Sequence, residues 1–205
     1  MKHGAEHGLD ADRVACMGES AGAWACGFLA HRSRAPSAQP DNDARFGFQG
    51  KGLRAMLGSY PPYDFNQYLS KEFDTFKMVT GQLPDIIRIL ATPRGSEGAA
   101  LRATPNWKDL IARSASFNVL TFVSAQSPPT LTVHGDQDRI VPYNGSVHMH
   151  KLLTKLGVPN HLITVHTAGH ALDLGVTSLP QQLEAFTLER MLDAALAPRP
   201  SNSSV

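Results

Sequence analysis

Gly18-Glu19-Ser20-Ala21-Gly22 is the stretch that decides the fold of this 205-residue chain. A short β-rich run, 13–17, precedes it, and a run of small and apolar residues, 21–31, follows it. This order predicts a strand, a sharp turn and a helix with Ser20 at the apex, an arrangement that presents a serine hydroxyl to a substrate. Gly18 and Gly22 are expected to remove the side chains that so tight a turn would crowd. The pentapeptide alone is weak evidence, so its surroundings carry the interpretation.

The composition is that of a globular protein of one domain, with 42% hydrophobic and 18% charged residues. Lysine and arginine number 19 and the acidic residues 18, a net charge of +1, so no nucleic-acid partner is expected. A small, roughly neutral substrate fits this balance better. We expect no membrane span, and residues 1–8 lack the apolar run of a signal peptide. The default expectation is a cytoplasmic protein.

The remainder of the chain alternates between strand and helix patterns. Apolar runs predict three further strands at 52–60, 130–135 and 161–166. Helical patterns follow the last two of them, at 146–156 and at about 179–196. Such alternation indicates an α/β fold with a mainly parallel sheet and helices on both faces.

The segment 61–125 differs, because short helical patterns alternate there with glycine and proline. We expect it to form a helical cap insertion within a single domain that covers 1–197, and we expect 198–205 to be a disordered tail. Tyr60 and Tyr63 stand where the cap begins and could line a substrate pocket. The alternative for each of these aromatic residues is an ordinary place in the core.

A serine hydroxyl becomes a nucleophile when a base removes its proton and a carboxylate holds that base in the right tautomer. Asp136 and Asp138 follow the strand predicted at 130–135, and His170 follows the next strand. Because the carboxyl ends of parallel strands meet at one edge of a sheet, these groups are expected to converge on Ser20. Spacing alone does not separate Asp136 from Asp138.

No metal or cofactor is expected. His148 and His150 invite a metal interpretation, but positions two apart lie on different sides of a helix. Cys16 and Cys26 flank the serine, and two cysteines alone make neither a disulfide framework nor a metal site. We expect them to be small buried thiols.

These motifs resemble those of the α/β-hydrolase superfamily and, within it, the carboxylesterase-like members of the bifunctional xylan and feruloyl esterase (BD-FAE) type. The matching residues, spread over about 1–175, are 9–14, 18–22, 129–138, Val141, Pro142 and 168–170. The resemblance implies Ser20 as nucleophile, Asp138 as orienting acid and His170 as general base. It also implies the backbone N–H of Ala21 as an oxyanion donor. The activity that it implies is hydrolysis of carboxylic esters through an acyl-enzyme. Glu19, next to Ser20, is a further candidate for contact with the substrate.

In this family a second oxyanion donor comes from a His-Gly-Gly loop on an earlier strand, and the residues before Ser20 hold no such loop. The chain is therefore expected to be the C-terminal portion of the fold, lacking N-terminal strands. The strand at 13–17 would then be an exposed edge that favours self-association. Two alternatives stay open: a truncated hydrolase or pseudoenzyme with little activity, and a serine peptidase of the prolyl-oligopeptidase type, which shares the three motifs.

Overall fold

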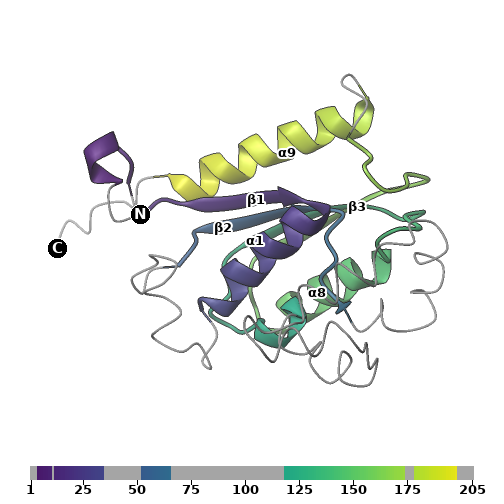
Figure 1. Cartoon of the computed structure of the whole chain (residues 1–205), viewed down its shortest axis with the longest axis horizontal. Helices are drawn as coiled ribbons and strands as arrows, with labels where there is room; N and C mark the ends of the chain where they lie inside the picture. The colour runs from purple at the N-terminus through teal and green to yellow at the C-terminus, as the bar shows by residue number, and fades with distance from the viewer. Residues whose placement is uncertain (1–3, 11, 35–51, 66–117, 174–177, 198–205) are drawn as a thin grey trace, which may run out of the picture.

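The computed structural model contains a four-stranded sheet (Figure 1), and it describes residues 4–10, 12–34, 52–65, 118–173 and 178–197. The strands are β1 (Ala15–Glu19), β2 (Ala55–Ser59), β3 (Thr130–Gly135) and β4 (Asn160–Val165). Their order in the sheet is their order in the chain, and every neighbouring pair is parallel. The predicted α/β fold with a parallel sheet is confirmed.

Helices cover both faces of this sheet, as predicted. Helices α1 (Ser20–Arg32) and α8 (Tyr143–Lys155) lie on one side, and α9 (Leu179–Leu196) lies on the other (Figure 1). Two short 3-10 helices, η1 (Ala5–His7) and η2 (Val119–Phe122), complete the described elements. In this part of the chain no helix combines the length and the apolarity needed to cross a membrane.

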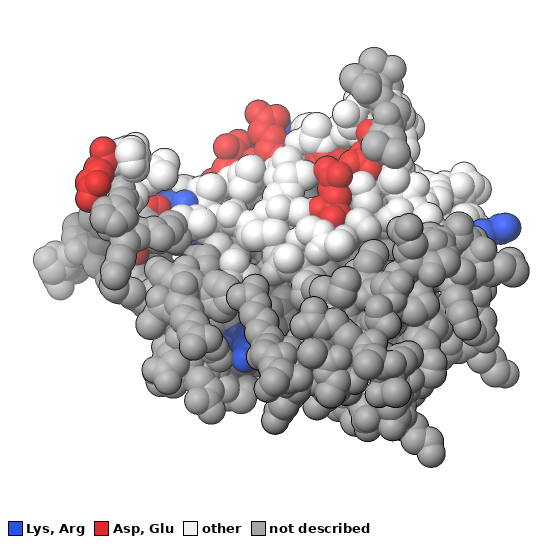
Figure 2. All heavy atoms as spheres, viewed as in Figure 1, with Lys and Arg blue, Asp and Glu red and all other residues white. Residues whose placement is uncertain are grey.

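The acidic side chains of the described residues lie in separate groups on the face seen in Figure 2. They are found mainly on the side of the molecule where α9 lies, in the upper part of the view. Uncharged residues separate these groups. The described part of this face therefore carries its acidic side chains in separate groups and not as one continuous acidic patch.

The predicted bounds hold for β3 and α9 and differ by one to three residues for the other strands and helices. Strand β1 begins at Ala15 because Arg13 still belongs to the preceding turn. The Arg13 N–H donates to the Asp10 carbonyl oxygen at 3.1 Å, and its guanidinium contacts the Asp10 carboxylate at 2.6 Å. Strand β2 ends at Ser59 because Tyr60 has a φ of 41°, which is incompatible with an extended strand.

Tyr63 lies in the hydrophobic core, which corrects the prediction that it contacts the substrate. Its side chain is 0% exposed, and its hydroxyl lies 3.2 Å from Met56 Sδ and 3.3 Å from Thr132 Oγ1. The remaining buried members of this cluster are Cys26, Ala30, Leu53, Met56, Val119, Met149, Leu153 and Val158. Tyr63 therefore packs α1 and η2 against the sheet.

Most of the predicted cap, and the whole of the predicted tail at 198–205, lie outside the described residues. The two described ends of the cap segment, 61–65 and 118–125, meet each other. The Val119 N–H donates to the Tyr63 carbonyl oxygen at 3.2 Å, and both side chains are buried. These ends therefore belong to the core of the domain.

Cys16 of β1 and Cys26 of α1 form a disulfide with an S–S distance of 2.09 Å. This corrects the expectation of free thiols. The reason is the sharp turn at Ser20, which folds α1 back along β1 and brings the two Cα atoms to 5.6 Å, within the range that a disulfide spans. The bond closes a loop around the pentapeptide 18–22.

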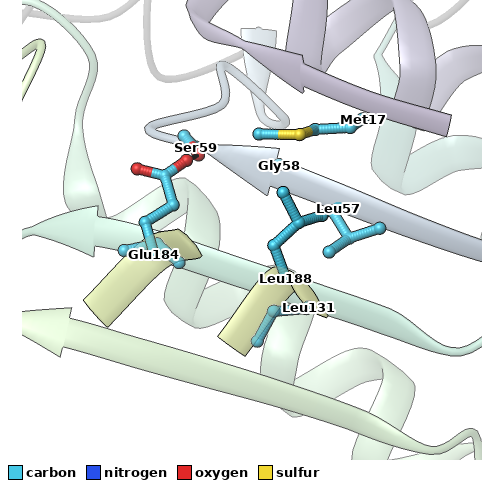
Figure 3. Close-up of a pocket in the computed structure, with 8 residues that line it drawn as sticks. Met17, Leu57, Gly58, Ser59, Leu131, Glu184 and Leu188 are labelled. Atoms are coloured by element: carbon cyan, nitrogen blue, oxygen red, sulfur yellow. Dashed lines mark hydrogen bonds between the residues drawn. The ribbon is translucent and has the colours of Figure 1, made fainter. Parts of the chain in front are cut away.

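Helix α9 directs one carboxylate into the sheet (Figure 3). Glu184 is 7% exposed and accepts a hydrogen bond from the Ser59 hydroxyl at the end of β2. Its Oε2 atom is buried without a hydrogen-bond partner. The apolar neighbours that line this small space include Met17, Leu57 and Leu188. Burial raises the pKa of Glu184, and the Ser59 hydrogen bond offsets this only in part.

The disulfide predicts how the thiols react. Because a reducing environment such as the cytosol opens disulfides, the protein is isolated without reductant. It is then unfolded so that any free thiol is accessible to the titrating reagent. We expect no reactive thiol before reduction and both cysteines to react afterwards. A cross-link over a loop of this length stabilises by about 2–3 kcal/mol, so the Cys16→Ser/Cys26→Ser variant should lose that amount in denaturant titration. Two reactive thiols in the untreated protein would contradict the pairing.

Glu184 predicts a pH-dependent stability. Because its pKa is higher in the folded state, the folded chain loses stability as pH rises above the ordinary value of 4.5 through the raised value. Glu184→Gln keeps an acceptor for Ser59 but has no charge to desolvate. Its free energy of unfolding should exceed that of the wild type at about pH 8, and the difference should shrink towards about pH 4.5. Denaturant titrations check this, with the exposed Glu189→Gln as control; a gain independent of pH would count against it.

Candidate active site

Ser20 stands at the junction of β1 and α1 with a φ of 48°, a conformation that residues other than glycine rarely adopt. Gly18 makes this turn possible, since a Cβ there would lie 2.4 Å from the backbone carbonyl carbon of Gly22. The expectation that a side chain at Gly22 would also be crowded is wrong, because nothing lies within 4 Å of a Cβ at that position. Of the two glycines, the turn therefore requires Gly18, because a Cβ at this position would clash with the backbone of Gly22.

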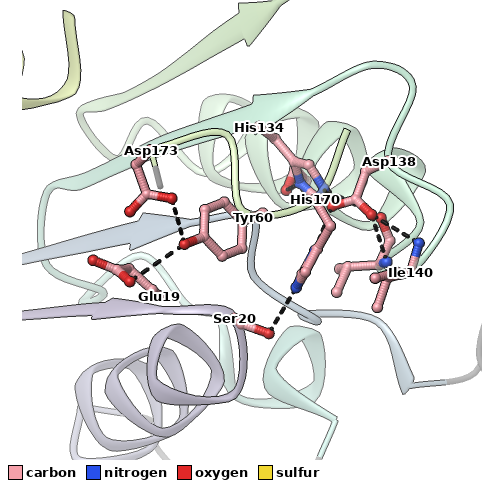
Figure 4. A network of polar contacts seen from close by, with 10 residues as sticks. Glu19, Ser20, Tyr60, His134, Asp138, Ile140, His170 and Asp173 are labelled. Carbon is pink, nitrogen blue, oxygen red and sulfur yellow. Dashed lines mark hydrogen bonds and ion pairs between the residues drawn. The ribbon is translucent and has the colours of Figure 1, made fainter. Parts of the chain in front are cut away.

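The three residues assigned from sequence meet at one edge of the sheet (Figure 4). Ser20 Oγ lies 3.1 Å from His170 Nε2, although the two residues are 150 positions apart. His170 Nδ1 lies 2.7 Å from Asp138 Oδ2. An ionised carboxylate only accepts hydrogen bonds, so Nδ1 carries the proton and Nε2 is left to accept the Ser20 hydroxyl proton. The geometry is that of a serine hydroxyl within hydrogen-bond distance of an imidazole nitrogen.

The Asp138 carboxylate uses both oxygens and is 0% exposed. Oδ1 accepts from the backbone N–H groups of Ile140 and Val141, each at 2.8 Å. Oδ2 accepts from His170 and from His134 Nε2, the latter at 3.1 Å. Burial by itself raises the pKa of Asp138, but these hydrogen bonds more than offset it and hold the pKa well below its usual range. Asp138 is therefore a carboxylate at neutral pH.

His134 is a member of the site that the sequence interpretation missed. It is fully buried in β3, and its Nε2 faces two acceptors, Asp138 Oδ2 at 3.1 Å and the Val141 carbonyl oxygen at 3.2 Å. Nε2 therefore carries a proton. Nδ1 lies 2.7 Å from the Ser146 hydroxyl of α8. The signal in the sequence is the spacing of four residues between His134 and Asp138, which one tight turn after a strand brings together.

The structure separates Asp136 from Asp138. The Asp136 carboxylate contacts His166 Nδ1 at 2.8 Å and accepts from the Thr167 N–H at 2.8 Å. The hydrogen bond from His166 lowers the pKa of Asp136. Asp136 thus fastens the turn after β3 to the loop after β4, whereas Asp138 contacts His170 itself.

The loops after β3 and β4 pack closely against each other. A Cβ at Gly135 would lie 2.2 Å from the Ala168 carbonyl oxygen, so only glycine fits at the end of β3. The Gln137 N–H donates to the same carbonyl oxygen at 3.0 Å. This contact sets the position of the loop that holds His170.

Tyr60 and Glu19, two further residues named from sequence, lie beside this group. The Tyr60 ring centroid is 4.7 Å from that of His170. Its hydroxyl lies 2.6 Å from Asp173 Oδ1 and 3.3 Å from Glu19 Oε2 (Figure 4). Asp173 was not predicted, since a single acidic residue three positions after His170 gives no distinctive pattern.

Ala21 is the second residue of α1 and is exposed. The first N–H groups of a helix have no carbonyl acceptor within it. The Ala21 N–H, next to the Ser20 hydroxyl, therefore lies at the positive end of the helix, where a negatively charged oxygen is favoured.

The structure places the two histidines considered as metal ligands apart from this site. His148 Nδ1 lies 3.2 Å from Asp64 Oδ2, and His150 Nδ1 lies 2.5 Å from Asn160 Oδ1. In the described ranges, no three residues among histidine, cysteine, aspartate and glutamate are grouped so that they could hold a metal ion.

Comparison with solved structures finds several esterases of the same fold. The esterase Est2 of Thermogutta terrifontis has a TM-score of 0.63 at 21% identity, over 98% of this chain and 62% of that one. The same esterase phosphorylated by paraoxon has a TM-score of 0.61 at 18% identity, over 97% and 60%. The carboxylesterase Cest-2923 of Lactobacillus plantarum WCFS1 has a TM-score of 0.58 at 17% identity, over 97% and 65%. This chain thus spans about three-fifths of the length of these structures.

No curated protein matches the chain. The sequence profile of the BD-FAE family matches residues 1–153, which include Ser20 and Asp138, while His170 lies beyond the matched part. The match covers more than half of the chain, and the solved structures share its fold. The chain belongs to the BD-FAE family, within the α/β-hydrolase fold.

Proposed function

We propose that this chain is a carboxylic ester hydrolase in which Ser20 is the nucleophile, His170 the general base and Asp138 the residue that orients His170. The observation that carries the proposal is the continuous pair of hydrogen bonds, 3.1 Å from Ser20 Oγ to His170 Nε2 and 2.7 Å from His170 Nδ1 to Asp138 Oδ2. The low pKa of Asp138 supports it, because an ionised carboxylate stabilises the imidazolium that forms during reaction.

The proposed reaction has two halves. His170 takes the Ser20 hydroxyl proton as the oxygen attacks the ester carbonyl carbon, and it then gives that proton to the departing alcohol. Water attacks the resulting acyl-enzyme with His170 again as base, which releases the acid and restores the serine. The Ala21 N–H donates to the oxyanion in both halves.

The proposed substrates are carboxylic esters of small or medium alcohols, including sugar and aromatic esters. Membership of the BD-FAE family supports this class, as does the fold shared with proteins described as esterases and a carboxylesterase. No metal or cofactor enters the proposed reaction. A p-nitroanilide assayed beside the p-nitrophenyl ester separates ester hydrolysis from peptidase activity.

A second candidate is a hydrolase portion with little turnover. The observation that favours it is length, because the chain covers only 60–65% of the similar structures. Loss of one oxyanion donor costs about a hundred- to a thousandfold in rate, so turnover would be slow if Ala21 were the sole donor. Ser20 would still react with an organophosphate, and this reaction separates an intact nucleophile from an inert chain.

Ser20→Ala tests the nucleophile. Est2 is phosphorylated by paraoxon, and we expect paraoxon to modify this chain once, on Ser20, as read by intact and peptide mass spectrometry. Ser20→Ala should abolish the modification and lower kcat/KM for p-nitrophenyl acetate by at least about a thousandfold. Ser33→Ala, at the other end of α1, is the control and should behave like the wild type. Equal labelling of the Ser20→Ala variant would refute the assignment.

Two neighbouring aspartates test the orienting acid. Asp138→Asn can no longer hold His170 in the required tautomer, so we expect kcat/KM to fall by about ten-thousandfold. Asp136→Asn keeps an oxygen for the Thr167 N–H and leaves the contact with His170 intact. Its kcat/KM should stay within about tenfold of the wild type. Equal losses in the two variants would be incompatible with the assigned roles.

A further inference from the structure

His170 lies on an irregular loop after β4, outside any helix or strand. Hydrogen bonds hold the two nitrogens of its ring, Nδ1 to Asp138 and Nε2 to Ser20. These contacts hold the ends of the imidazole but constrain only weakly its rotation about the line that joins them. The loop is fastened before His170, where Thr167 and Ala168 contact the turn after β3, so a contact beyond His170 would hold it on the other side as well.

The Tyr60 ring packs against this imidazole. The two centroids are 4.7 Å apart and the rings are inclined at 65°, an edge-to-face arrangement. Tyr60 is itself firmly held, with 3% exposure and a backbone N–H that donates to the Val133 carbonyl oxygen of β3 at 2.7 Å. A fixed ring at this distance limits the angles that the His170 ring can adopt.

The Tyr60 hydroxyl makes a second contact with the same loop. It donates to Asp173 Oδ1 at 2.6 Å, three residues beyond His170. Glu19 Oε2, from the residue before Ser20, lies 3.3 Å from the Tyr60 hydroxyl oxygen. Burial raises the pKa of Tyr60, and the hydrogen bond to Asp173 raises it further. The phenol therefore keeps its proton and remains a donor over the working pH range.

We propose that Tyr60 is a positioning residue for His170: its ring orients the imidazole, and its hydroxyl ties the His170 loop to the end of β2 through Asp173. The inference rests on the proposed function and deepens it, since Tyr60 acts through His170 rather than by contact with the substrate. Figure 4 shows the arrangement, with the Tyr60 hydroxyl between Glu19 and Asp173 and its ring beside His170.

Tyr60→Phe removes the hydroxyl and keeps the ring. Loss of one hydrogen bond that restrains the loop should lower kcat for p-nitrophenyl acetate by about tenfold. KM should stay within about twofold, because no substrate contact is lost. Tyr63→Phe is the matched control, since its buried hydroxyl contacts Met56 and Thr132 in the core. We expect it to alter stability while kcat stays at the wild-type value.

Asp173 provides a double-mutant cycle. Asp173→Ala should lower kcat as much as Tyr60→Phe does, and the double variant should be no slower than either single variant, because all three lose the same hydrogen bond. Asp173→Asn keeps an acceptor oxygen and should recover most of the rate. Additive losses, a raised KM with unchanged kcat, or an equal loss of kcat in Tyr63→Phe would each overturn the positioning role.

A readout without turnover separates this inference from the proposed function. In NMR spectra of the imidazole groups, Tyr60→Phe should shift and broaden the His170 signals, and Tyr63→Phe should leave them unchanged. If paraoxon does not label Ser20 but the His170 signals respond in this way, the hydrolase proposal fails and the positioning role of Tyr60 stands. If the wild type shows labelling and turnover but Tyr60→Phe leaves both kcat and the His170 signals unchanged, the positioning role of Tyr60 fails and the hydrolase proposal stands.

Discussion

Parallel pairing of the four strands in one fixed register is the constraint on which the site depends. It places Glu19 beside Ser59, Ser59 beside Val133, and Gly135 beside Val165. All four strands therefore end at the same edge of the sheet, where the open backbone ends of parallel strands form a common crevice. Ser20, Tyr60, Asp138 and His170 follow these ends within five residues. A shift of register in any pair would separate groups that now lie within hydrogen-bond distance.

The turn after β3 is the centre of the polar network at this edge. The Asp138 carboxylate receives four hydrogen bonds, two from the backbone of its own turn and two from histidines. Asp136, in the same turn, fastens the loop after β4 through Thr167. Gly135 lets the two loops approach more closely than a side chain would allow. This short turn thus keeps the Asp138 carboxylate ionised, orients the His170 imidazole and sets the position of the loop that carries His170.

The turn at Ser20 requires support of a different kind. A φ of 48° is unfavourable for a serine, and such conformations persist only where the surrounding structure enforces them. The strand before Ser20 and the helix after it are joined by the disulfide between Cys16 and Cys26. The missing side chain at Gly18 allows the helix to begin directly against the end of the strand. Covalent and steric constraints together hold the hydroxyl where His170 can reach it.

The sequence by itself determined the elements and the nature of the site. Local periodicity placed β3 and α9 at their observed bounds, because alternation and helical spacing are properties of neighbouring residues. The small residues around Ser20 predicted the turn for the same reason. The order of serine, acid and histidine after three of the predicted strands pointed to Ser20, His170 and either Asp136 or Asp138, and the family resemblance selected Asp138, which the structure brings together with the other two.

Only the tertiary structure shows which of several residues with equivalent spacing take part. Asp136 and Asp138 are alike in sequence, yet only Asp138 contacts His170. Tyr60 and Tyr63 are three positions apart, and the positive φ at Tyr60 separates a residue beside the site from one in the core. The cysteine pair, the buried His134 and the contact with Asp173 were likewise absent from the prediction. The physical reason is that such contacts depend on how strands and loops are packed in three dimensions, and the local sequence pattern carries no record of that packing.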